Sequence, residues 1–368
     1  MKALLQQKYI VAFSRYAVAA LFIFSGFSKA IDPWGTSFVI DEYLRAYAME
    51  SFLPWSLTLS ILLSGFELMF GIMVLIKLLP RITSLVTLVV MTIFTIVTLL
   101  SATVFTIADC GCFGEVLKLS PWLTFTKNVV ILPFVAYLWW HYRKLGWFDI
   151  NRSGLGVLGA VFVVAFGVGV YSYLYLPFID MSPYKKGANL LELAVPNYGD
   201  VADEDTYIYK NLSDGELREF TLDELAEVSD VEWEWVETKS ATPAVAEQSA
   251  DEGFTIADAE GDATVEILSY EGTTYLLCIT EFDAVTLSCA ERMKGVVVKA
   301  EKEGSQVVIL TPDVLNGVTY YNFIDSPLVR CYNIDGRVMK NLLRAENGLV
   351  VLENGIIREK YNCRSIDF

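Results

Sequence analysis

The chain has 368 residues, of which 54% are hydrophobic, and its net charge is −16. The charge is divided unevenly, because residues 1–178 carry 12 Lys and Arg against 8 Asp and Glu, whereas residues 179–368 carry 16 against 36. The net charge of −20 on the second half argues against nucleic acid and anionic lipid as its partners. We therefore expect a membrane-embedded first half and an acidic soluble second half.

Five apolar runs are each long enough to cross a lipid bilayer as a helix of about 20 residues. The first run is preceded by Lys2 and Lys8, and a positively charged segment before an apolar run is typical of a signal peptide. However, it is long and no clear cleavage site precedes Lys29, which indicates an uncleaved span. The predicted spans are residues 11–31, 56–79, 82–105, 122–142 and 155–177.

Positive charges in the connections between spans predict the orientation, because Lys and Arg are enriched on the cytoplasmic side. Eight of them fall on one side, and these are Lys2, Lys8, Arg15, Lys77, Arg81, Arg143, Lys144 and Arg152. Five fall on the other side, and these are Lys29, Arg45, Lys118, Lys185 and Lys186. We expect a bacterial inner-membrane protein with a cytoplasmic N-terminus and residues 179–368 in the periplasm.

The stretch "IADCGCFGE", residues 107–115, places Cys110 and Cys112 in the loop between the third and fourth predicted spans. In the expected topology this loop faces the same oxidising compartment as the soluble half. The chain has six cysteines in all, and six allow fifteen pairings, so their connectivity stays open. The other four are Cys278, Cys289, Cys331 and Cys363.

The pair Cys110 and Cys112 admits three interpretations. A disulfide across a single residue closes a strained ring that is easily reduced, so it suits thiol exchange, and Gly111 gives the backbone the freedom that such a ring needs. The alternatives are two structural thiols, free or in a static disulfide, and a zinc site. Because the only histidine, His141, lies on the predicted cytoplasmic side, we predict no metal.

Two ionisable residues are candidates for a polar pocket inside the bundle. Glu67 lies in the second predicted span, where an ionisable side chain faces the bundle interior or a polar partner. Its role is either local and structural, or it handles protons or binds a ligand. Lys127 lies near the start of the fourth span, and we expect it to line the same pocket as Glu67.

Three segments, "LFIFSGFSKAIDPWG", "FELMFGIMVL" and "DCGCFGEVLKLSPWLTFTKNVVIL", resemble the DoxX-like superfamily of four-helix membrane proteins, nearest its MauE branch. The resemblance covers about residues 8–145, and the layout with a fifth span and an acidic tail is similar to DoxX-family proteins of Bacteroidetes. The resemblance to the MauE branch implies a role in disulfide processing of a periplasmic enzyme. The resemblance to other DoxX-like proteins implies a role in quinone-linked sulfur oxidation. A quinone is thus the cofactor that the resemblance suggests, while the residues alone require none.

The soluble half divides into two predicted regions. Residues 179–253 form an extracytoplasmic linker that is extended at first and contains a β-hairpin around Asp214. Residues 254–368 form an α/β domain with a central mixed sheet, in which strands alternate with helices before a closing hairpin. The strands are "TTYLLCIT", "SQVVIL", "LVRCYNI" and "GLVVLENGIIREKY", and the helices are expected at residues 284–303, 313–325 and 337–345.

Over about residues 254–362 this order resembles a thioredoxin fold of the peroxiredoxin type, in a degenerate form. The segment after the first strand, "TEFDAVTLSCAERM", lacks the Cys-x-x-Cys of a thioredoxin, and Glu346-Asn347-Gly348 stands where a cis-proline is expected. We therefore expect no dithiol oxidoreductase activity from this domain by itself. Among its cysteines, Cys278, Cys289 and Cys331 are expected in the core and Cys363 is expected to be the most exposed.

The predicted architecture is an all-α membrane bundle, with four DoxX-like helices in residues 1–150 and a fifth in residues 151–178, followed by the soluble regions. The leading hypothesis is a lipid-embedded protein that supports periplasmic thiol–disulfide or quinone-linked redox chemistry through Cys110 and Cys112, as an accessory to a periplasmic or membrane protein partner. The rival hypothesis is a non-catalytic membrane-anchored scaffold or binding subunit of an envelope complex.

Overall fold

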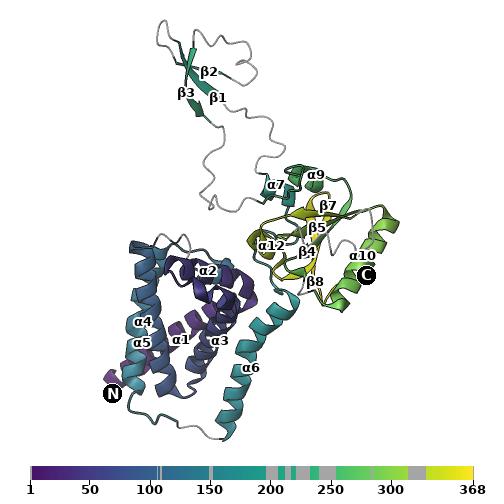
Figure 1. Ribbon diagram of the computed structural model, residues 1–368. Helices are drawn as coiled ribbons and strands as arrows, with labels where there is room; N and C mark the ends of the chain where they lie inside the picture. Colours follow the sequence, from purple (N-terminus) through teal and green to yellow (C-terminus); the bar gives the residue numbers. More distant parts are fainter. Residues whose placement is uncertain are drawn as a thin grey trace.

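A computed structural model of the protein describes most of both halves (Figure 1). The described residues are 2–105, 107, 110–148, 152–195, 206–211, 217–220, 233–239, 254–282, 285–313 and 329–367. The expected turn at Asp214 and all but the first residue of the expected helix over residues 313–325 lie outside these ranges.

The first half is a bundle of long apolar helices, as predicted. The segments long and apolar enough to span a membrane have mean hydropathies between 1.2 and 2.4. Their backbone groups are hydrogen-bonded within the helix, which the interior of a bilayer demands. The helices are α1 (Lys2–Ile31), α3 (Ser56–Ile76, preceded by the 3₁₀ turn η1, Glu50–Trp55), α4 (Pro80–Thr103), α5 (Pro121–Tyr142) and α6 (Arg152–Tyr175).

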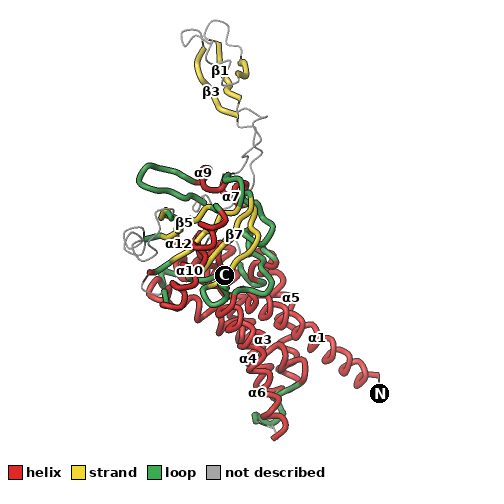
Figure 2. Tube along the Cα trace, turned by 90° about the vertical axis from the view of Figure 1, so that its right-hand side faces the viewer, coloured by secondary structure: helices red, strands yellow, loops and turns green. Residues whose placement is uncertain are grey.

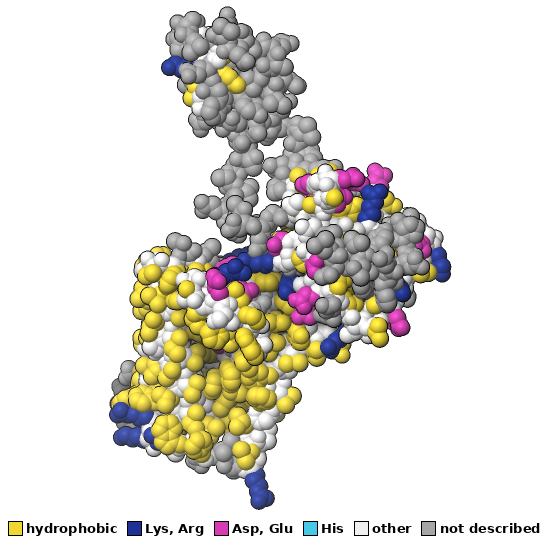
Figure 3. Space-filling view, viewed as in Figure 1, with side chains coloured by type: hydrophobic (Ala, Val, Ile, Leu, Met, Phe, Trp, Pro, Cys, Tyr) yellow, Lys and Arg dark blue, Asp and Glu magenta, His cyan; other side chains and the backbone are white. Residues whose placement is uncertain are grey.

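The outer surface of the bundle is hydrophobic, as a lipid-facing surface must be (Figure 3). Lys and Arg side chains gather at the end of the bundle that is farthest from the α/β domain. Inside, α1 and α3 pack closely, because a Cβ on Gly26 would lie 2.3 Å from the backbone nitrogen of Leu68. The smallest side chain is therefore required where these two helices cross.

A short helix, α2 (Pro33–Ala46), covers the end of the bundle that faces the α/β domain (Figure 1). Asp32 caps it, since the Asp32 carboxylate accepts a hydrogen bond of 2.8 Å from the backbone N–H of Gly35. Pro33 occupies the first helical position, where a missing N–H costs nothing. The sequence predicts an amphipathic helix over residues 38–49, able to lie on the bilayer, and the observed helix begins five residues earlier and ends at Ala46. In the structure, Val39, Tyr43 and Leu44 line a cavity together with the cysteine loop.

The second half contains an α/β domain with a five-stranded mixed sheet in the order β6-β5-β4-β7-β8. Strands β4, β5 and β6 are parallel, whereas β7 pairs antiparallel with β4 and with β8. The strands are β4 (Thr273–Ile279), β5 (Gln306–Thr311), β6 (Arg330–Asn333), β7 (Asn347–Glu353) and β8 (Ile356–Asn362). The helices are α9 (Thr264–Leu268), α10 (Leu287–Glu303) and α12 (Gly336–Leu343).

The sheet lies between two hydrophobic layers, because successive side chains of a strand point to opposite faces. On β4, Leu276 and Cys278 pack with α12 and α9, whereas Leu277 and Ile279 pack with α10. This burial on both faces explains why β4 and β5 read as continuous apolar runs. Figure 2 shows α10 and α12 beside the strands. The specific likeness to a thioredoxin stays a prediction.

The connection between the halves departs from the extended linker expected over residues 179–200. It contains the short helix α7 (Leu190–Ala194), and Leu190 and Leu191 are buried in the core of the α/β domain. Farther along, β1 (Thr206–Asn211) pairs antiparallel with β2 (Leu217–Phe220), as the hairpin pattern predicts. A third strand, β3 (Trp233–Lys239), which the sequence analysis missed, pairs with the other side of β1.

The α/β domain docks on the α2 end of the bundle. Arg337 of α12 forms an ion pair of 2.9 Å with Glu42 of α2. The Asn362 side chain donates a hydrogen bond of 2.6 Å to the carbonyl of Leu174, near the end of α6. The loop that carries Cys110 also contacts α2, so the cysteine pair and the α/β domain lie at the same end of the bundle.

Candidate functional site: the Cys110–Cys112 loop

Cys110 and Cys112 lie in the loop between α4 and α5, with 3.3 Å between their sulfur atoms. Both are free thiols in this structure. Cys110 is buried, with 7% of its surface exposed, and Cys112 is partly exposed. The two sulfur atoms are therefore close enough to form a disulfide after a small movement.

The local sequence builds a tight turn that holds the thiols together. Gly111 and Gly114 both have positive φ angles, which glycine adopts without strain, and the Gly114 N–H donates a hydrogen bond of 3.1 Å to the Gly111 carbonyl. Gly111 also leaves room for α2, since a Cβ at this position would lie 2.4 Å from Cγ1 of Val39. The Phe113 ring packs on Phe24 of α1, with 5.1 Å between the centroids, and anchors the loop on the bundle.

A cavity of about 300 Å³ lies beside the thiols, between α2, α3 and α4. Its lining is mostly apolar and includes Val39, Leu44, Leu63, Phe94 and Val97. The polar groups that it contains come from Lys29, Thr36, Tyr43, Tyr47, Thr98 and the loop Cys110–Gly111–Cys112. An apolar cavity with a few convergent polar groups is the usual form of a small-molecule site.

The surroundings favour ionisation of Cys110. A hydrogen bond from the Cys112 thiol is the largest effect, and together with the hydroxyl of Tyr43 and the charge of Lys127 it outweighs burial and lowers the pKa of Cys110 to about 6. The same hydrogen bond, together with burial, raises the pKa of Cys112 well above its ordinary value. Cys110 is therefore the thiolate of the pair and Cys112 the proton donor.

Tyr43 connects α2 to this pair. Its hydroxyl lies 3.5 Å from the sulfur atom of Cys110, and it accepts a weaker contact of 3.4 Å from Ser101 of α4. Burial raises the pKa of the Tyr43 hydroxyl, followed by the effect of the neighbouring Cys110. Tyr43 therefore stays protonated and acts as a donor to the thiolate.

Glu67 forms a buried ion pair with Lys29 of α1, in which both carboxylate oxygens lie 2.8 Å from the Lys29 Nζ. Ser25 connects this pair to the cysteine loop. Its hydroxyl lies 2.7 Å from Oε2 of Glu67 and 2.7 Å from the carbonyl oxygen of Cys112, and it accepts a hydrogen bond of 3.0 Å from Lys29. The Glu67 carboxylate thus has a cationic partner, and Ser25 connects it to the backbone of Cys112.

Lys127 lies at the start of α5, and its Nζ stands 4.3 Å from the centroid of the Phe113 ring. It lines a small cavity of about 20 Å³ together with Glu67, Lys29 and Cys112. All four residues singled out from the sequence, Cys110, Cys112, Glu67 and Lys127, therefore lie at one place in the structure. Asp109 lies outside the described residues, and nothing is described of the Glu115 side chain.

The sequence analysis did not identify Lys29 and Tyr43 as site residues. It counted Lys29 among the loop charges, whereas Lys29 is buried in α1 and only 4% exposed. Its position inside the first apolar run was visible, but the pairing with Glu67 depends on the packing of α1 against α3. Among the described residues, no group of three or more His, Cys, Asp or Glu side chains could hold a metal ion.

Comparison with known proteins agrees with this architecture over the membrane half. Residues 7–141 match the family described as "Methylamine utilisation protein MauE". No curated protein and no solved structure matches the chain significantly. The matched region contains α1 to α5 and the loop with both cysteines, and the α/β domain lies beyond it. The N-terminal membrane region of this protein, residues 7–141, is thus similar to the MauE family.

Proposed function

We propose that the protein is a membrane-bound thiol–disulfide redox protein, in which Cys110 and Cys112 pass electrons from thiols of a partner protein to a quinone. The observation that carries the proposal is that the two thiols line a mostly apolar cavity between membrane helices. The MauE family match supports a link to redox or cofactor maturation. The orientation that goes with this function has the cysteine loop and the α/β domain in the periplasm.

The first half-reaction follows from the properties of the two sulfur atoms. A thiolate of the partner attacks Cys112 of the oxidised pair, because Cys110 is the better leaving thiolate. The partner's second thiol then displaces Cys112. The partner ends as a disulfide, and Cys110 and Cys112 end as two thiols that have gained two electrons and two protons.

The cavity fits a quinone by its lining. Apolar side chains surround most of it, while the buried Tyr47 hydroxyl, which has no hydrogen-bond partner among the described residues, can donate to a carbonyl oxygen. Ile93 lines the same cavity and is 51% exposed on the hydrophobic surface, so the cavity adjoins the region where lipid lies. A bound quinone supplies an acceptor for two electrons and two protons.

The remaining residues hold the thiols in place. Tyr43 donates a hydrogen bond to the Cys110 thiolate and keeps it ionised. Ser25, held by Lys29 and Glu67, fixes the backbone at Cys112. Lys127 adds positive charge, which favours the thiolate form of Cys110. These are positioning roles, because none of these groups exchanges electrons.

The proposal is tested with the full chain in lipid nanodiscs. The protein is reduced, the reductant is removed, and a quinone is added while its absorbance and the mass shift of Cys110 and Cys112 are followed. We expect one quinone to be reduced for each disulfide formed, and we expect Cys110→Ser and Cys112→Ser to abolish this. Cys278→Ala is the matched control, since Cys278 is fully buried in the α/β domain.

The proposal is contradicted if the wild-type protein does not reduce the quinone. It is also contradicted if both serine variants reduce the quinone as well as the wild type does. The scaffold hypothesis makes the opposite prediction in cells. There, replacement of both cysteines leaves the phenotype unchanged, while deletion of residues 254–368 abolishes it.

A further inference from the structure

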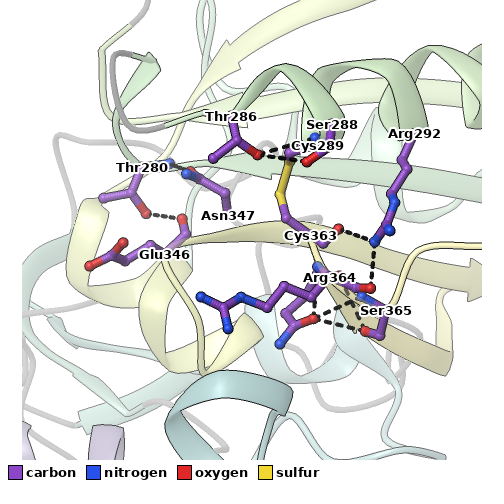
Figure 4. Close-up of a disulfide and its surroundings, with 11 residues drawn as sticks. Thr280, Thr286, Ser288, Cys289, Arg292, Glu346, Asn347, Cys363, Arg364 and Ser365 are labelled. Carbon is purple, nitrogen blue, oxygen red and sulfur yellow. Dashed lines mark hydrogen bonds between the residues drawn. A yellow bond between two sulfur atoms is a disulfide. The ribbon is translucent and has the colours of Figure 1, made fainter.

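The α/β domain holds a second pair of cysteines that the sequence analysis did not connect. Cys289 of α10 and Cys363, just after β8, form a disulfide with 5.1 Å between their Cα atoms (Figure 4). Cys289 lies in the core, as expected, and Cys363 is partly exposed, but the two are joined in a disulfide that the sequence did not reveal. The other two cysteines of the domain, Cys278 and Cys331, are free.

We propose that the Cys289–Cys363 disulfide is redox-active and accepts two electrons from the dithiol of a partner polypeptide that binds in the adjoining cleft. The cleft has a volume of about 170 Å³ and is lined by both cysteines. It lies between the α/β domain and the bundle, since Trp34 of α2 and Tyr173 and Leu174 of α6 form its other wall. This inference does not depend on the proposed function of Cys110 and Cys112.

The two sulfur atoms of this disulfide differ in access. Cys289 is 2% exposed and packs in the core beside α10, whereas Cys363 is partly exposed. An incoming thiolate therefore reaches Cys363. Attack there forms a bond between the partner sulfur and Cys363 and breaks the bond to Cys289, which leaves as a thiolate.

The position of Cys289 suits a leaving thiolate. It lies in the first turn of α10, which has 17 residues, where the positive end of the helix dipole stabilises negative charge. Thr286 caps this turn by accepting a hydrogen bond of 3.3 Å from the N–H of Cys289. A stabilised leaving group makes a disulfide easier to reduce.

The second thiol of the partner completes the step. It attacks the partner sulfur of the mixed disulfide and releases Cys363 as a thiol, while the Cys289 thiolate takes up a proton. The partner becomes a disulfide, and the domain gains two electrons and two protons as the thiols of Cys289 and Cys363. No further oxidant or reductant is needed to balance this exchange.

Hydrogen bonds also tie the segment around Cys363 to α10, independently of the disulfide. Arg292, one turn after Cys289, donates a hydrogen bond of 2.9 Å to the carbonyl of Cys363 and a second to the carbonyl of Arg364 (Figure 4). The Asn362 side chain accepts hydrogen bonds of 3.0 Å from the N–H groups of Arg364 and Ser365. The Arg292 bonds hold the segment beside α10 and the Asn362 bonds fix its turn, so the reduced pair is expected to stay close enough to re-form the disulfide.

The experiment uses the full chain in detergent micelles with Cys110→Ala and Cys112→Ala, so that its failure leaves the proposed function untouched. A reduced synthetic peptide with the sequence Cys-Ala-Ala-Cys in an extended segment is the probe. We expect it to reduce the Cys289–Cys363 disulfide while circular dichroism shows the domain still folded, with one peptide disulfide formed per protein. A disulfide that stays closed in excess peptide until the domain unfolds overturns the proposal.

The direction of attack is tested with variants that each keep one cysteine of this pair and with a peptide that carries an activated mixed disulfide. Cys289→Ser leaves Cys363 free, and Cys363→Ser leaves Cys289 free. We expect Cys363 to form the mixed disulfide at least about ten-fold faster, because access limits thiol exchange. Equal rates, or a faster Cys289, contradict the assigned direction.

The cleft is tested with Tyr173→Ala, which removes part of its membrane-side wall. We expect slower reduction by the peptide and unchanged reduction by dithiothreitol, which is too small to need the wall. Tyr171→Ala is the matched control, since Tyr171 lies two residues away on the same helix and is 51% exposed on the outer surface. If Tyr173→Ala and Tyr171→Ala behave alike towards the peptide, the docking part of the proposal is wrong.

Discussion

Arg344 and Asp32 form a buried ion pair between the α/β domain and the membrane bundle. The Nε of Arg344 lies 3.0 Å from Oδ2 of Asp32, and only 1% and 5% of the two side chains are exposed. Both residues stand at helix ends, since Arg344 follows α12 and Asp32 caps α2. The Asp32 carboxylate thus has two roles. It caps the N-terminus of α2, which lines the thiol cavity, and it pairs with Arg344 of the docked α/β domain.

We expect Arg344→Met and Asp32→Asn each to destabilise the protein by about 3–5 kcal/mol, because each leaves one buried charge without its partner. The double variant should lose less than the sum of the two single losses. Thermal unfolding of the full chain in detergent measures both quantities. Arg358→Met is the control, since its pair with Glu353 is half-exposed and contributes about 1 kcal/mol or less. Strictly additive losses would contradict a direct pair.

We expect Gly111→Ala to separate the two thiols of the membrane pair. Its φ of +62° disfavours a Cβ, and that Cβ would lie 2.4 Å from Val39. Disulfide formation between Cys110 and Cys112 should slow by about ten-fold or more, as expected for a strain of a few kcal/mol. Mass spectrometry of alkylated samples measures the rate. Gly159→Ala is the control, since nothing lies within 4 Å of a Cβ there.

We expect alkylation of the reduced membrane pair to depend on pH through Cys110. Since the pKa of Cys110 is about 6, its thiolate already predominates at neutral pH, and the rate should level off above about pH 7. Tyr43→Phe removes a donor to the thiolate, so it should raise the pKa and move the plateau to higher pH. The measurement is the rate of iodoacetamide labelling against pH, with Tyr171→Phe as the control. A plateau unmoved by Tyr43→Phe would count against this hydrogen bond.

We expect Glu67→Gln to loosen the cysteine loop, because it leaves the Lys29 ammonium buried without a carboxylate and weakens the contact through Ser25. Labelling of Cys112 should become several-fold faster in the reduced protein. The variant Glu67→Gln with Lys29→Met removes both charges and should recover part of the stability measured by thermal unfolding. A double variant less stable than Glu67→Gln would show that Lys29 acts through other contacts.

Local sequence patterns determined the elements of this protein. Runs of about 20 apolar residues can only be stable as helices in lipid, so the spans were predictable one at a time. The strands β4 and β5 could be predicted in the same way, because each is a short apolar run followed by a helical pattern. The Cys-Gly-Cys loop was visible for the same reason, because its two thiols are neighbours in the sequence.

Tertiary structure decided which distant residues meet. The partner of Glu67, the donor to Cys110 and the pairing of Cys289 with Cys363 all join different elements, and no periodicity encodes such contacts. The inward face of α2 has the same origin, since an amphipathic helix buries its apolar face against whatever covers it. Here the covering surfaces are the cysteine loop and the helices α3 and α4, and only the packed chain brings them there.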